Sequence, residues 1–146
     1  MPDMQLVPIS PTAKGSGTFT GDVYVTSISA PTDPAYLAAG IVRFMPGART
    51  YWHMHPTGQT LHVLDGIALV STRDGSVVRA RAGETVLCPP GVDHWHGATP
   101  DTLAVHVAMV AARGDRPGTD WLEPVADEDY AAACQRSLGA APAAGQ

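Results

Sequence analysis

The sequence predicts a single all-β domain, a sandwich or barrel, that ends in one short helix. From residue 21 onward, short segments rich in Val, Ile, Tyr and Thr follow one another, and glycine-containing turns separate them. Many short strands punctuated in this way are typical of sandwiches and barrels. At 146 residues with 45% hydrophobic residues, the chain has the length of one domain and can bury one core of ordinary size.

The expected strands are separated by short turns in which glycine follows Pro, Asp or Ala. The strands are expected at Asp22–Ile28, Leu37–Met45, Thr60–Leu64, Ile67–Thr72, Val77–Ala80, Thr85–Cys88 and Thr102–Val110. The turns are expected at Pro46-Gly47, Asp65-Gly66, Asp74-Gly75, Ala82-Gly83 and Pro90-Gly91.

The two ends of the chain differ from this central domain, which we place at residues 18–126. Residues 1–17 contain several prolines and glycines and suit an extended arm that can cover a neighbouring subunit. Residues 127–138 begin with acidic side chains, continue with alanines and carry an arginine late, which predicts a helix that ends before Gly139. Residues 139–146 are a low-complexity tail that we expect to be disordered.

Charge and composition argue against several classes of partner. The formal net charge is −5 and the basic residues are scattered, so we expect no nucleic acid partner and no membrane partner. No apolar stretch approaches the roughly 20 residues of a spanning helix, and the N-terminus lacks the features of a signal peptide. We therefore expect a cytoplasmic protein, in which Cys88 and Cys134 are reduced and unpaired.

Residues 53–59 have the pattern of a metal site on a strand. Side chains two apart on an extended chain point to the same face, so His53 and His55 can reach one ion while Met54 points away. Gln59 shares their parity and is the expected amide ligand. The alternative for Gln59 is an inward-facing amide that hydrogen-bonds a water on the metal.

A second cluster supplies the remaining expected ligand, His94, directly after a turn formed by Pro89 and Gly91. A lone histidine is more often a core or surface residue than a ligand. Three histidines at regularly spaced positions favour metal binding, because neutral imidazole is a preferred ligand of transition metals.

In these two motifs the chain resembles the cupins, a family of small metal-binding barrels. The first cupin motif, G-x5-H-x-H-x3-E-x6-G, matches Gly47, His53, His55 and Gly66, and the second, G-x5-P-x-G-x2-H, matches Gly83, Pro89, Gly91 and His94. Gln59 stands where most cupins have glutamate, and Ala98 where the second motif usually closes with asparagine. The resemblance implies a jelly-roll β-barrel that forms a homodimer or homotetramer.

A narrower set of residues extends beyond the two motifs. It comprises Phe44, Pro46 to Thr50, Trp52-His53, His55-Pro56, Gly58 to Leu61, His94 to Ala98, His106 and Asp120-Trp121. In these residues the chain resembles the small bacterial cupin hydroxynitrile lyases, which depend on manganese, and it departs from them at Met54, His62 and Val110. The resemblance implies that His53, His55, Gln59 and His94 hold the metal and that His106 transfers a proton.

Gln59 has a physical consequence for the chemistry of such a site. Three neutral imidazoles and a neutral amide leave the double charge of a divalent ion uncompensated, which makes the ion a stronger Lewis acid. The charge stabilises a developing alkoxide and disfavours oxidation of the metal. It favours lyase or isomerase chemistry over oxygen activation.

Further candidate residues surround the expected ligands. His106 shares a strand face with the small residues Ala104 and Ala108, so we expect it to line a cavity and act as acid or base; the alternative is a buried structural histidine. His96 has the parity of His94 and is a second candidate for proton transfer or substrate orientation. The expected substrate-binding residues are Phe44, Thr50, Val42 and Val110.

We therefore expect a metal-dependent lyase of the hydroxynitrile lyase type, which cleaves or forms cyanohydrins of aldehydes or ketones. Its expected cofactor is one divalent transition metal, with manganese favoured and Fe, Ni or Zn as alternatives. The alternative functions are an iron-dependent cupin dioxygenase, a metal-dependent isomerase, and a non-catalytic cupin that binds a small molecule.

Overall fold

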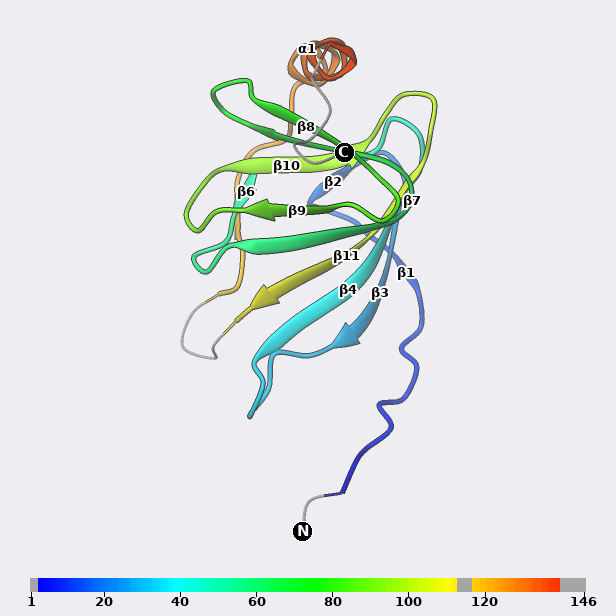
Figure 1. Cartoon of the computed structure of the whole chain (residues 1–146), viewed down its shortest axis with the longest axis vertical. Coiled ribbons are helices and arrows are strands. Elements are labelled where there is room, and N and C mark those ends of the chain that lie inside the picture. Colours follow the sequence, from blue (N-terminus) through cyan, green and yellow to red (C-terminus); the bar gives the residue numbers. More distant parts are fainter. Residues whose placement is uncertain (1–2, 113–116, 140–146) are drawn as a thin grey trace.

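The computed structural model describes residues 3–112 and 117–139 of the chain. Figure 1 shows a strongly curled, strand-rich half-barrel with one helix at the top of the view, next to β8. The elements are β1 (Ala13–Lys14), β2 (Phe19–Thr20), β3 (Val23–Ser29), β4 (Leu37–Phe44), β5 (Arg49–Thr50), β6 (His53–Met54), β7 (Gln59–Thr72), β8 (Val77–Arg81), β9 (Thr85–Cys88), β10 (His94–Ala98), β11 (Ala104–Ala111), β12 (Asp120–Trp121) and α1 (Asp127–Leu138).

Antiparallel pairing joins the strands in the order β1-β3-β4-β11-β7-β10-β5-β2. The long strand β7 belongs to both halves of the barrel: its first part pairs with β11 and β9, and its second part pairs with β10 and β8. Every strand that carries a predicted metal ligand is therefore attached, directly or through β10, to β7.

The turn predicted at Asp65-Gly66 is wrong, because β7 runs through it without interruption. Gly66 has a φ of 72° and lies opposite β11, whose register against β7 shifts near this point. A glycine with positive φ beside a register shift bends a strand sharply while its hydrogen-bond ladders continue on both sides. One bent strand thus replaces the two strands that the sequence predicted.

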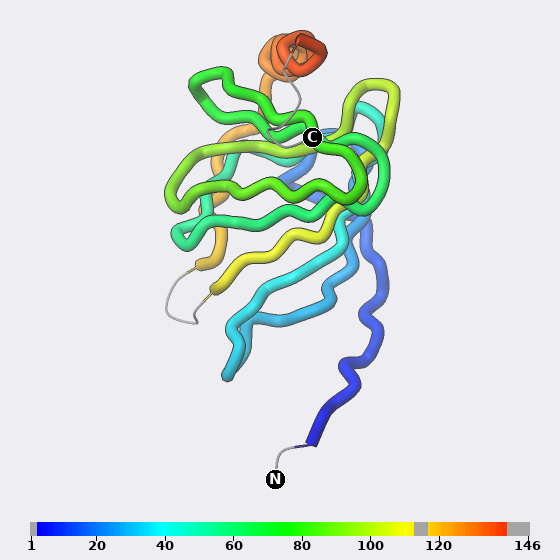
Figure 2. Tube along the Cα trace, viewed as in Figure 1, coloured from blue at the N-terminus to red at the C-terminus, as the bar shows by residue number. Residues whose placement is uncertain are grey.

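The N-terminal segment leaves the barrel after a short contact. β1 pairs with β3, and residues 3–12 then extend away from the strands without secondary structure (Figure 2). Met4, Leu6 and Ile9 expose 103%, 97% and 96% of their surface. The predicted tail, apart from Gly139, and the first two residues lie outside the described residues.

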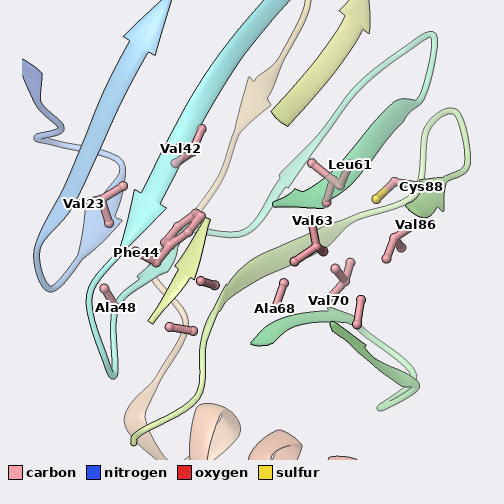
Figure 3. Close-up of a cluster of buried hydrophobic side chains, with 13 residues drawn as sticks. Val23, Val42, Phe44, Ala48, Leu61, Val63, Ala68, Val70, Val86 and Cys88 are labelled. Carbon is pink, nitrogen blue, oxygen red and sulfur yellow. The ribbon is translucent and has the colours of Figure 1, made fainter. Parts of the chain in front are cut away.

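Apolar side chains fill one part of the barrel interior (Figure 3). Alternation along β7 buries Leu61 and Val63 while Thr60, His62 and Leu64 face outward, as a period of two requires. The main core cluster consists of Val23, Val42, Phe44, Ala48, Leu61, Val63, Ala68, Val70, Ala80, Val86, Cys88, Ala98 and Ala104.

A second cluster fixes the helix, which has the range predicted from the sequence. Tyr130 and Ala133 of α1 pack with Trp95 and Leu69, and the Tyr130 hydroxyl donates to the Ala98 carbonyl over 2.6 Å. Within the described part of the chain, no helix is long and apolar enough to cross a membrane.

Candidate metal centre

The structure brings His53, His55 and His94 together inside the barrel. β6 and β10 are antiparallel neighbours in which His53 lies opposite His94, while His55 follows β6 directly. The ring centroids of His53 and His94 are 4.3 Å apart, and that of His55 lies 5.0 Å from His53 and 5.5 Å from His94. All three side chains are buried.

Backbone carbonyls set the orientation of each of these imidazoles. Nδ1 of His53 lies 2.9 Å from the Tyr51 oxygen, Nδ1 of His55 lies 2.8 Å from the Gly118 oxygen, and Nδ1 of His94 lies 3.1 Å from the Val92 oxygen. A carbonyl only accepts, so each Nδ1 carries the proton and each Nε2 keeps its lone pair. Histidines that bind metals are commonly oriented in this way.

Gln59 completes this arrangement from the start of β7. Its Oε1 lies 3.2 Å from Nε2 of His94, and Nε2 of His55 is buried without a hydrogen-bond partner in the described structure. Two acceptor atoms that face each other without a proton between them repel, and a cation between them removes the repulsion. The donor set therefore fits a divalent metal ion.

His96, predicted for proton transfer or substrate orientation, lies next to this cluster. Ligand nitrogens of His53, His94 and His96 are all within 4.8 Å of one another. Its Nδ1 contacts Nε2 of His106 over 3.0 Å, and its Nε2 is buried without a partner among the described residues. His96 therefore joins the three-histidine site to His106.

Burial keeps these histidines neutral near pH 7. Desolvation lowers the pKa of His53 to about 3 and those of His94 and His106 to about 4. Burial also lowers the pKa of His55, and it holds that of His96 well below its usual value. Neutral imidazoles offer lone pairs, as metal binding and proton acceptance both require.

A cavity of about 390 Å³ opens beside the histidine cluster. Six of the predicted metal and substrate residues line it, and so does His96; the six are Val42, Thr50, His53, His55, Gln59 and Val110. His106 and Phe44 lie behind this lining: both are fully buried, and the Phe44 ring packs 5.3 Å from that of His106. Their assigned roles remain predictions.

Several residues that line the cavity were not predicted as site residues. They include Phe19 on β2, Ser27 and Ser29 on β3, Thr119, and Trp121 on β12. β2 and β12 contain two residues each, and strands this short leave no alternation in the sequence from which a cavity-facing side could be deduced.

The comparisons with known proteins agree with this fold and site. A family model described as a cupin domain matches residues 40–111. The chain is 41% identical over 130 residues to the (R)-mandelonitrile lyase of Granulicella tundricola, a match that spans 87% of this chain and 98% of the relative. The chain belongs to the cupin family.

Solved structures place this cupin among similar barrels. A cupin-like protein from Thermotoga maritima is 34% identical, with a TM-score of 0.78, over 89% of this chain and 97% of its own. A polyketide cyclase from Streptomyces resistomycificus, 16% identical with a TM-score of 0.66 over 88% of this chain and 91% of its own, shares the fold. The cupin fold and the short C-terminal helix predicted from the sequence are confirmed. A group of three histidines that could hold a divalent metal is also present, formed by His53, His94 and His96.

Proposed function

We propose that this cupin is a metal-dependent lyase that cleaves cyanohydrins to an aldehyde or ketone and hydrogen cyanide, and forms them in the reverse direction. The proposal rests mainly on an uncharged set of metal ligands beside one cavity, with the pair of His96 and His106 next to it. The mandelonitrile lyase relative, which matches over most of the chain, supports the same reaction.

The proposed ligands are His53, His55, Gln59 and His94, and the proposed ion is manganese, with Fe, Ni and Zn as alternatives. A divalent cation held there would supply positive charge that stabilises negative charge developing on the substrate oxygen. Gln59 adds no charge of its own, so this stabilisation is undiminished by an anionic ligand.

The pair of His96 and His106 is proposed to take up the hydroxyl proton of the cyanohydrin. With the shared proton on Nδ1 of His96, Nε2 of His96 is free to accept the cyanohydrin hydroxyl proton at the cavity wall. The oxygen electrons form the carbonyl double bond, the bond to the nitrile carbon breaks, and cyanide leaves with that electron pair. Cyanide then takes the proton, so no co-reactant is consumed. His106 holds the His96 ring through the 3.0 Å contact.

The test combines metal analysis by mass spectrometry with an assay of mandelonitrile cleavage on the same samples. We expect one bound metal per chain and cleavage in the wild type, and loss of both in His53→Ala. His96→Ala should keep the metal and lose about 100-fold or more in kcat, as expected when a general acid or base is removed. His62→Ala is the matched control, since His62 faces away from the cavity and contacts Thr85.

Each contrary result points to a different function. Bound metal without cleavage overturns the lyase proposal, and oxygen uptake with ferrous iron would then indicate a dioxygenase. Isomerisation of a hydroxycarbonyl compound would indicate an isomerase. Absence of metal after purification and after reconstitution would indicate a small-molecule-binding cupin.

A further inference from the structure

Two aromatic residues that the reaction above does not use form one wall of the cavity. The Trp121 ring lies 4.7 Å from that of His53, at 38°, and 6.2 Å from that of Phe19, at 64°. Phe19 in turn packs edge-on against Phe44 over 6.3 Å. We call Phe19 and Trp121 the aromatic wall; it extends from the histidine cluster toward solvent.

Strand pairing positions the aromatic wall beside the site. Trp121 on β12 lies opposite His53 on β6, and Phe19 on β2 lies opposite Thr50 on β5. Each aromatic residue is thus held in register with a residue that lines the reacting end of the cavity. The distance from the wall to the histidines is set by backbone hydrogen bonds, which makes it well defined.

Strands β3, β4 and β11 contribute only uncharged side chains to the cavity lining. They are Val25, Ser27, Ser29, Ala38, Ala39, Gly40, Val42, Ala108 and Val110. No Asp, Glu, Lys or Arg is among the described residues that line the cavity. Aromatic side chains in an otherwise uncharged lining suit an apolar group such as an aromatic ring, and the lining offers no partner for a charged substituent.

Trp121 is also partly exposed, although it lines the cavity. It leaves 44% of its surface uncovered although its ring contacts two others. A large apolar ring half-open to a cavity gains contact area when a ligand covers it.

We propose that the aromatic wall of Phe19 and Trp121 determines substrate specificity by binding the aryl group of an aromatic cyanohydrin or aldehyde. This inference rests on the proposed function for the reaction, although the binding of an aryl group can be tested without turnover. The substrate class is a neutral α-hydroxynitrile whose carbon substituent is a flat aromatic ring.

The test compares an aryl with a small alkyl substrate. Trp121→Ala should raise KM for mandelonitrile about tenfold, because it removes one ring contact and the apolar area buried with it. KM for acetone cyanohydrin, which has no ring, should stay within about twofold. Leu122→Ala is the matched control: Leu122 is the next residue, is 39% exposed and does not line the cavity, and it should change neither value.

Two further measurements separate specificity from damage to the site. Because Trp121 packs on His53, metal content is measured for each variant, and Phe19→Leu serves as a second variant without a ring contact to His53. Saturation-transfer NMR with benzyl alcohol as an unreactive aryl probe reports binding alone. The signal should be strong for wild type and for Leu122→Ala and weak for Trp121→Ala and Phe19→Leu.

The outcomes distinguish this inference from the proposed function. A wild type that cleaves neither cyanohydrin overturns the proposed function. The NMR signal of benzyl alcohol then tests by itself whether the aromatic wall binds an aryl group. Equal KM changes for both substrates in a metal-loaded variant overturn the aromatic wall, as does an undiminished benzyl alcohol signal in both variants. A signal lost in both variants supports it.

Discussion

Replacing Gly66 by alanine should destabilise the protein severely, because this glycine meets two requirements at once. Its φ of 72° costs an L-residue about 1–2 kcal/mol. An added Cβ would also lie 1.8 Å from the Leu103 carbonyl oxygen, so the two strands would have to separate by about 1.2 Å to reach the 3.0 Å limit of real contacts. That separation would weaken the hydrogen bond from Ile67 N–H to the Leu103 carbonyl, worth about 1 kcal/mol.

The expected loss is therefore about 2–3 kcal/mol or more in the free energy of unfolding, measured by urea denaturation at fixed protein concentration. Alanine substitutions at two other glycines separate the cost of the positive φ from the cost of the steric clash. Gly83 has a φ of 91° and nothing within 4 Å of an added Cβ, so Gly83→Ala should cost only about 1–2 kcal/mol. Gly97→Ala meets the Ala48 carbonyl oxygen at 2.4 Å without a positive φ and isolates the steric cost. A Gly66→Ala protein as stable as Gly83→Ala would refute the reasoning.

Three further predictions concern pH, helix docking and assembly. Between pH 6.5 and about 4 the unfolded chain binds more protons than the folded one, because burial lowers the pKa of the site histidines. Metal-free protein should therefore lose about 1.4 kcal/mol per pH unit for each such histidine as the pH falls; a melting temperature that is flat with pH would contradict this. Arg49→Met should cost about 1.5–3 kcal/mol by urea denaturation, since it removes the hydrogen bond that the buried Arg49 guanidinium donates to the Val125 carbonyl over 2.8 Å. Asp127→Asn should cost under about 1 kcal/mol, because the Asp127 side chain is 95% exposed. If both variants lost the same free energy of unfolding, the burial of Arg49 would not explain its contribution. We also propose a homodimer or homotetramer to which the arm contributes, so changing Met4, Leu6 and Ile9 together to serine should lower the mass seen by light scattering, and an unchanged oligomer would exclude the arm.

The local patterns that were predictable share one property: they depend on strand alternation over a few residues. His53 and His55 lie two apart, and their side chains reach the same cavity. The alternation of side chains along β7 likewise indicates which of them enter the core. Helix α1 was predictable from its acidic start and its terminal glycine.

Other features depend on which strands become neighbours, and short-range patterns carry no such information. The contact between His96 and His106 joins β10 to β11, which do not pair with each other and are both attached to β7. Phe44, whose predicted role at the substrate stays a prediction, packs against the rings of His96 and His106, because β4 ends in the apolar core.

By itself the sequence determined that this chain is a cupin-like barrel, and it predicted three histidines and a glutamine as ligands of one ion, since the spacing within each motif decides which side chains share a face. The tertiary structure alone decided that Trp121 lies against His53 and that His96, rather than His106, reaches the cavity wall. The physical reason is that closure of the barrel aligns strands far apart in the chain. The register of that alignment is set by hydrogen bonds and packing over the whole sheet.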